Sequence, residues 1–73
     1  MADVELDCMG LNCPMPIVRI SRRMKKMDAG EVLQVVADDP AFTADVRAWV
    51  KRMGHELVDV VETKPYRAVI RKS

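Results

Sequence analysis

Twice in this 73-residue chain a strand-like apolar segment gives way to apolar residues at helical spacing, and each change falls at a proline. Residues 4–8 alternate between apolar and acidic side chains, which predicts a half-buried strand. Apolar residues then recur at helical spacing over residues 14–28. Pro14 and Pro16 suit the first turn of this helix, and Gly30 suits its C-terminal cap.

A second strand and a second helix repeat this arrangement. Residues 31–37 form an apolar run of β-forming residues, which predicts a central strand. Asp39 suits the N-cap of the following helix, Pro40 its first turn and Gly54 its end. The side chains expected to face the core are Ile17, Ile20, Met24 and Met27 of the first helix and Phe42, Val46, Trp49, Val50 and Met53 of the second.

Two further strands complete the predicted fold. Residues 55–63 and 66–72 are apolar and rich in β-forming residues, although Leu57 disturbs the alternation of the first of them. The turn at Lys64 and Pro65 is short, so these strands are expected to be antiparallel. The element order is βαβαββ, and right-handed crossovers place both helices on one face of the sheet. We therefore predict an α/β fold, a two-layer βαβαββ sandwich, in a single domain of residues 1–73.

The composition excludes several classes of protein. The chain is 49% hydrophobic and 32% charged, which indicates a globular rather than a disordered protein. Its net charge of +1 does not predict a polyanionic partner. No apolar run approaches the length of a membrane span, and the first residues lack a secretion signal. We expect no membrane contact and a cytoplasmic location, where cysteines are kept reduced.

The stretch "DCMGLNCPMP", residues 7–16, contains both cysteines of the chain, and Cys13 is the candidate reactive thiol. Its expected place at the N-cap of the first helix would lower the pKa of its thiol, because unpaired N–H groups and the helix dipole stabilise a thiolate. The prolines that follow would hold the sulfur outward. An exposed thiolate without a lid suits exchange with another protein. The alternative is a small, half-buried residue in a capping turn.

Cys8 is expected to differ from Cys13, because the strand pattern turns it toward the core with Val4 and Leu6. It is either an inert buried residue or a second, resolving thiol that pairs with Cys13 under oxidation. The spacing is not the Cys-X-X-Cys of dithiol oxidoreductases. Two cysteines and one histidine are too few for a tetrahedral structural site, so no metal is expected.

Other polar and exposed residues allow more than one interpretation. His55 is either a general base for Cys13 or an exposed residue at the start of a strand. Asp38 and Asp39 resemble a paired-carboxylate site, although the following proline favours Asp39 as a helix cap. Met15 is expected to project beside Cys13 and to contact a partner.

Basic residues are concentrated in two places. The first group is Arg19, Arg22, Arg23, Lys25 and Lys26, and the second is Arg47, Lys51 and Arg52. Each group is either a solvated helix face or a docking surface for an acidic protein or RNA.

Three stretches, "LDCMGLNCPMP", "MDAGEVLQVVADDP" and "HELVDVVETKPYRAVIRKS", together resemble the TusA/SirA-like small sulfur carriers over nearly the whole chain. The resemblance implies a mixed four-stranded sheet with an antiparallel last strand, similar to the C-terminal domain of bacterial translation initiation factor three. The positions that match the supporting part of the motif are Asp7, Gly10, Leu11, Pro14 and Pro16.

The resemblance also implies an activity: Cys13 accepts sulfane sulfur as a persulfide and passes it to an acceptor protein. Such relays serve tRNA thiolation, molybdenum-cofactor assembly or sulfur oxidation. The implied donor is a cysteine desulfurase or a rhodanese-like protein, and the implied acceptor is a DsrE-like or other thiol protein. Contact with RNA would be indirect, and no cofactor is needed. Cys8 and Met9 depart from the pattern of the tRNA-thiolating members, which weakens that particular role.

Two other functions remain open from the sequence. The chain could be a thiol redox protein that uses Cys8 and Cys13 as a pair. Alternatively, the basic first helix and the fold similarity suggest a non-catalytic module that binds RNA or protein.

Overall fold

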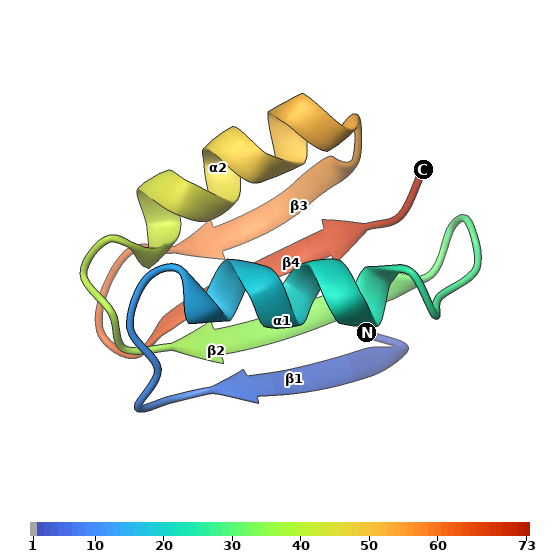
Figure 1. Ribbon diagram of the computed structural model, residues 1–73. Helices are drawn as coiled ribbons and strands as arrows, with labels where there is room; N and C mark the ends of the chain where they lie inside the picture. Colours follow the sequence, from blue (N-terminus) through green and yellow to red (C-terminus); the bar gives the residue numbers. More distant parts are fainter. Residues whose placement is uncertain (1) are drawn as a thin grey trace.

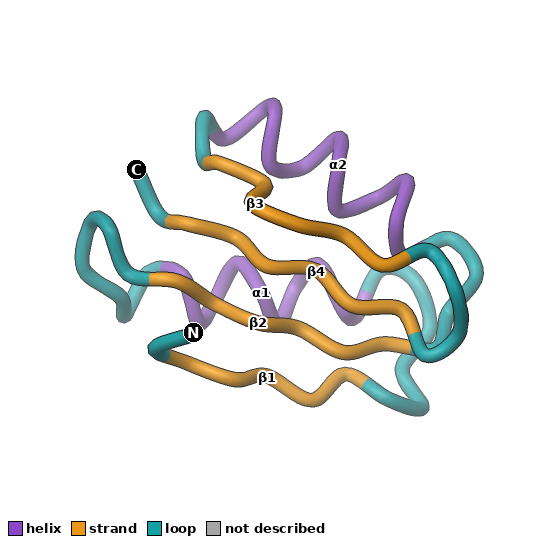
Figure 2. Tube along the Cα trace, turned by 180° about the vertical axis from the view of Figure 1, so that it is seen from behind, coloured by secondary structure: helices purple, strands orange, loops and turns teal. Residues whose placement is uncertain are grey.

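A mixed four-stranded sheet forms one layer of the protein, and two helices form the other (Figure 1). The computed structural model describes residues 2–73. The elements in chain order are β1 (Val4–Cys8), α1 (Met15–Met24), β2 (Val32–Ala37), α2 (Phe42–Met53), β3 (Glu56–Val61) and β4 (Tyr66–Arg71). Both helices cover one face of the sheet, and the opposite face carries none (Figure 2). The predicted two-layer βαβαββ sandwich is confirmed.

The strands lie in the order β1-β2-β4-β3. β1 pairs in parallel with β2, and the last strand, β4, is antiparallel to both of its neighbours, as the family resemblance implied. The disturbed alternation at Leu57 corresponds to a register irregularity between Leu57 and Asp59 in β3. Because Cys8 lies opposite Ala37, β1 and β2 end at the same edge of the sheet. The loops that lead into the two helices therefore start side by side.

The core lies between the sheet and the helices. Its largest fully buried side chains are Phe42, Ile20, Leu33, Ile70, Val35, Val46 and Cys8. The prediction that Met53 belongs to this core is wrong, because 51% of the residue is exposed. Met53 is the last residue of α2, so no further turn covers it, and it borders a surface groove with Lys25 and His55.

The helix α1 is shorter than the predicted 14–28, because tight turns replace it after Met24. The N–H of Met27 donates to the carbonyl of Met24, three residues back, although Met27 itself stays buried as predicted. Gly30 does not cap the helix. It has a φ of 91°, and its N–H donates to the Lys72 carbonyl at 2.7 Å. This hydrogen bond joins the segment before β2 to the residue that follows β4.

The helix α2 begins at Phe42 with Ala41 at its N-cap, and no side chain caps it, so the prediction of Asp39 as the N-cap is wrong. The predicted stop at Gly54 is confirmed: this residue has a φ of 79°, and its N–H donates to the Val50 carbonyl at 2.9 Å. Within residues 2–73, neither helix is long and apolar enough to cross a bilayer.

Candidate functional site

Cys13 lies exposed in the loop between β1 and α1, at the edge where β1 and β2 end. Pro14 is the N-cap of α1 and Met15 its first residue, so Cys13 lies one position farther from the helix than predicted. The Cys13–Pro14 peptide bond is cis. Pro16 belongs to the first turn of α1 and is buried, whereas Met15 is 41% exposed. The sulfur and the Met15 side chain are thus both accessible on this loop.

Three aspartates hold the backbone of this loop. Asp7 Oδ1 accepts a hydrogen bond from the N–H of Met9 at 2.9 Å. Asp38 Oδ1 accepts one from the N–H of Gly10 at 3.0 Å, and Asp39 Oδ2 accepts one from the N–H of Cys13, also at 3.0 Å. The loop that carries the thiol is therefore tied to the end of β2.

The role of Asp38 and Asp39 in holding the Cys13 loop was missed by the sequence interpretation. Asp39 Oδ1 does contact the N–H of Ala41 before α2, at 3.4 Å, but its other oxygen holds Cys13. A signal was present in the sequence, because two predicted parallel neighbours must end at one edge of the sheet. The aspartates after the second strand could have been placed beside the loop after the first.

Gly10 and Leu11 shape the start of the same loop. Gly10 has a φ of 79°, a left-handed conformation that side chains disfavour. The N–H of Leu11 donates to the Cys8 carbonyl at 3.2 Å, and its side chain packs against the core. The conformation of Gly10 and the contacts of Leu11 together fix the turn that follows β1. Both residues therefore have a structural role at their positions in the motif.

A surface hollow of about 340 Å³ lies beside Cys13, between the two helices. Its lining residues are Cys13, Pro14 and Ile17 from the α1 side and Asp45, Ala48, Trp49 and Arg52 from α2. The α2 residues recur at helical spacing and form one stripe. Ile17 and Trp49 make the walls largely apolar, while Asp45 and Arg52 supply charges of opposite sign.

The pKa of the Cys13 thiol lies above its ordinary value. A hydrogen bond with the Asp45 carboxylate is the main cause, with smaller contributions from partial desolvation and from the charges of Asp45 and Asp39. The prediction that the helix N-terminus lowers this pKa is wrong, because Cys13 lies outside the first turn and beside carboxylates. This environment favours the protonated thiol over the thiolate, and the thiolate fraction grows as the pH rises.

Cys8 differs from Cys13 as the strand pattern predicted. It is fully buried at the end of β1, and both cysteines are free. Burial raises the pKa of the Cys8 thiol, against the opposing effect of the nearby Arg19 charge. A buried, protonated thiol is a poor nucleophile, which favours a packing role for Cys8.

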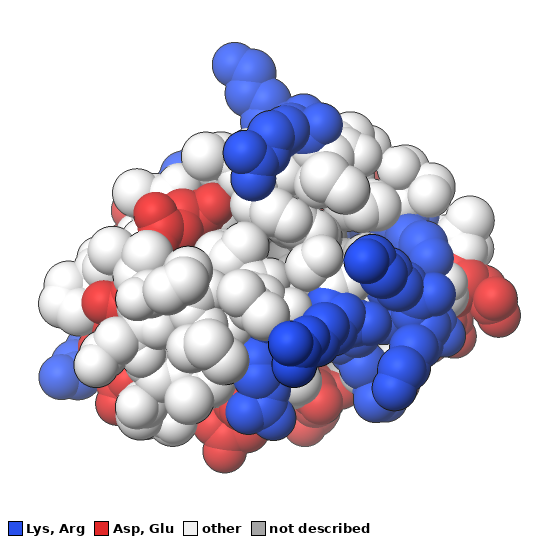
Figure 3. All heavy atoms as spheres, in the orientation of Figure 1, with Lys and Arg blue, Asp and Glu red and all other residues white. Residues whose placement is uncertain are grey.

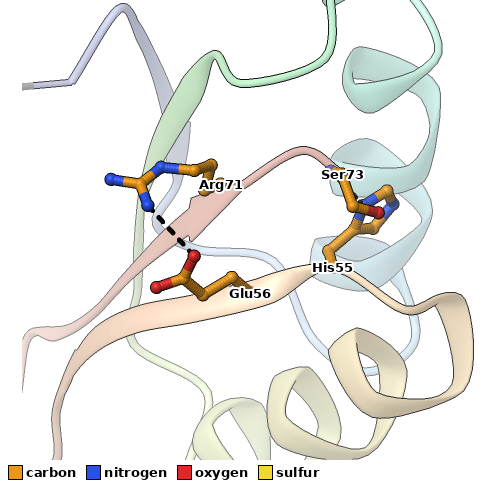
Figure 4. A network of polar contacts seen from close by, with 4 residues as sticks. All are labelled: His55, Glu56, Arg71 and Ser73. Atoms are coloured by element: carbon orange, nitrogen blue, oxygen red, sulfur yellow. Dashed lines mark hydrogen bonds and ion pairs between the residues drawn. The ribbon is translucent and has the colours of Figure 1, made fainter.

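His55 lies away from the hollow beside Cys13 and has other partners. Its Nδ1 accepts a hydrogen bond from the N–H of Ser73 at 3.2 Å, and its ring lies 5.4 Å from that of Trp49. Figure 4 shows His55 against Ser73, next to the ion pair of Arg71 with Glu56 across β3 and β4. The structure therefore does not place His55 as the base for Cys13. Among residues 2–73, no three His, Cys, Asp or Glu side chains are grouped as a metal site.

The first basic group forms a continuous surface, whereas the second does not. Arg19, Arg22, Arg23, Lys25 and Lys26 are all exposed on α1 and the turn that follows it, where Figure 3 shows cations gathered. In the second group, Arg47 pairs with Glu62 at 2.8 Å and Arg52 lines the hollow. The cluster on α1, here called the basic surface, is the stronger candidate for docking.

Comparisons with known proteins identify the family of this chain and support its fold. The family model described as sulfurtransferase TusA matches residues 4–72. The chain belongs to the TusA family. YrkF of Bacillus subtilis (strain 168), which is named as a sulfur carrier protein, is 47% identical over 72 residues. That match covers 97% of this chain but 39% of YrkF, so the chain spans about two fifths of this TusA relative.

A solved structure supports the TusA fold independently. The SirA-like protein of Desulfitobacterium hafniense superposes with a TM-score of 0.77 and covers 93% of each chain, at 21% identity. At this identity the likeness is evidence for the fold alone. The recognition of the chain as a member of the TusA/SirA-like family is confirmed by the family model.

Proposed function

We propose that this TusA-family protein accepts sulfane sulfur as a persulfide on Cys13 and passes it to a thiol of an acceptor protein. The observation that carries the proposal is the exposed Cys13, held by Asp39 in the loop that bears the family motif. Cys8 is fully buried, so Cys13 is the cysteine that another protein can reach.

The proposed reaction is a thiol exchange that needs no cofactor. The Cys13 thiolate attacks the terminal sulfur of a donor persulfide, a new S–S bond forms, and the S–S bond of the donor breaks. The donor leaves as a thiolate and takes up the proton that Cys13 lost, so no net oxidation occurs. A second exchange passes the sulfur to the acceptor, and the rate depends on thiolate fraction, nucleophilicity and access.

Intact-mass spectrometry tests the proposal directly. Incubation of the reduced protein with inorganic polysulfide, followed by its removal, is expected to add the mass of one sulfur atom. Dithiothreitol should remove this mass, and peptide mapping should place the sulfur on Cys13. Failure to load, or sulfur found on Cys8, would overturn the proposal.

We propose further that the basic surface docks an acidic donor or acceptor, with Met15 as a contact beside the thiol. The basic surface lies on α1 and the turn after it, and the loop that carries Cys13 leads into the same helix. A cysteine desulfurase or a rhodanese-like protein is the proposed donor and a DsrE-like protein the proposed acceptor. The cytoplasm is the proposed location, because Cys13 must stay a thiol between transfers.

Charge reversal on the basic surface tests docking. Arg22→Glu with Arg23→Glu is expected to slow transfer from a persulfide-loaded rhodanese about tenfold or more at low salt, because steering attraction becomes repulsion. The difference should shrink as ionic strength rises. Loading by polysulfide should not change. Lys64→Glu with Arg67→Glu alters the net charge equally at exposed residues outside α1 and should leave transfer unchanged. Equal rates for the two double variants would remove the docking role.

The redox alternative is less well supported by the structure. A Cys8–Cys13 disulfide requires Cys8, which is fully buried, to leave its place opposite Ala37 at the end of β1. The exposed thiol alone is sufficient for a carrier. A non-catalytic binding module predicts partner binding that survives the loss of Cys13.

A further inference from the structure

One face of α2 brings a carboxylate to the Cys13 thiol. Asp45 lies in the first turn of α2, is half-buried and lines the hollow together with Cys13. Figure 3 shows acidic atoms gathered over this end of α2. The ion pairs within residues 2–73 use the carboxylates of Glu56 and Glu62, and Asp45 takes part in neither of them. Asp45 is thus available to the sulfur.

The other charged groups near Cys13 have different roles. Asp39 uses one carboxylate oxygen for the backbone N–H of Cys13 and the other for that of Ala41. Arg52 lines the same hollow from the last turn of α2, about two helical turns from Asp45. Asp45 is therefore the charged side chain in position to orient the sulfur itself.

We propose that Asp45 is a positioning residue for Cys13: its carboxylate accepts the S–H hydrogen bond and directs the sulfur into the hollow between the helices. The role of this contact in sulfur transfer rests on the proposed function. The contact itself is made by the free thiol and does not depend on that function. A thiol that donates to a carboxylate is less acidic, so Asp45 also protects Cys13 from stray electrophiles before a donor docks. The raised pKa of Cys13 agrees with this geometry.

The rate of alkylation of Cys13 by iodoacetamide, measured as a function of pH, tests the assignment. Asp45→Asn keeps the shape of the side chain but removes its charge, so the rate profile is expected to move to lower pH. At neutral pH the variant should react faster, because more of its thiol is ionised. On the high-pH plateau it should react slightly more slowly, because a less basic thiolate is a weaker nucleophile. The two profiles should therefore cross.

Three matched variants separate this contact from general effects. Asp45→Glu restores a carboxylate and should return the profile toward that of the wild type. Asp59→Asn makes the same charge change at an exposed site outside the hollow and should leave the profile in place. Arg52→Gln removes a cation from the hollow and should not move the profile to lower pH. An unmoved profile in Asp45→Asn, or the same downward movement in Arg52→Gln, overturns the assignment.

Polysulfide loading of the same proteins distinguishes this assignment from the proposed function. If the alkylation profile moves as expected and no protein gains sulfur, the proposed function fails and the positioning role stands. If the wild type gains sulfur and the Asp45→Asn profile does not move, the positioning role fails and the carrier function stands.

Discussion

Replacement of Cys13 by serine is expected to abolish sulfur loading completely. The serine hydroxyl is nearly isosteric with the thiol, but at neutral pH it cannot form a persulfide by thiol exchange. Because Cys13 is exposed, the substitution leaves the core untouched, and the circular dichroism spectrum should match that of the wild type. Intact-mass spectrometry after polysulfide treatment is the measurement. A Cys13→Ser protein that gains sulfur as readily as the wild type contradicts the proposed site.

Cys8 supplies the matched control for this experiment, because it is the other cysteine of the chain. Cys8→Ala is preferable to serine, since a hydroxyl at this fully buried position would need a hydrogen-bond partner. The alanine variant should load one sulfur atom, as the wild type does. If Cys8 instead resolves Cys13, mild oxidation of the wild type will remove the mass of two hydrogen atoms, whose electrons pass to the added oxidant, and either variant will abolish that loss.

Much of the fold could be predicted because its signals are local. The alternation over residues 4–8 identified β1 and the inward direction of Cys8, and Gly54 marked the end of α2. Helix ends were harder, because they depend on contacts elsewhere in the fold. Gly30 followed an apolar stripe as a cap would, yet its N–H is held by Lys72 at the far end of the chain.

The environment of Cys13 shows why the site was only partly predictable. The exposed thiol and its turn could be located from the motif, but the expected shift in the pKa of Cys13 had the wrong sign. The helix that follows the thiol is the only local source of such a shift, whereas Asp45 and Asp39 reach the thiol from distant parts of the chain. Charges brought together by tertiary structure decide such a shift, and a local motif does not reveal them.

Phe42→Ala is expected to have the largest effect on stability. Phe42 is the first residue of α2 and is 1% exposed. It belongs to the buried face of this helix together with Trp49, which also lines the hollow. Truncation of a buried phenylalanine costs about 3–5 kcal/mol. A chain of 73 residues has a free energy of unfolding of roughly 4–11 kcal/mol. The variant should therefore melt at least about 12 °C lower, or be largely unfolded, as calorimetry or thermal circular dichroism would show.

Met53→Ala on the same helix is the control, because sequence periodicity assigned Met53 to the core and the structure exposes it. With 51% of the residue exposed, its truncation should change the free energy of unfolding by no more than about 0.5 kcal/mol. Chemical denaturation of both variants gives the comparison. Equal losses of stability would mean that α2 packs through a stripe that includes Met53. The hollow beside Cys13, which depends on the orientation of Trp49 and Asp45, would then need a different geometry.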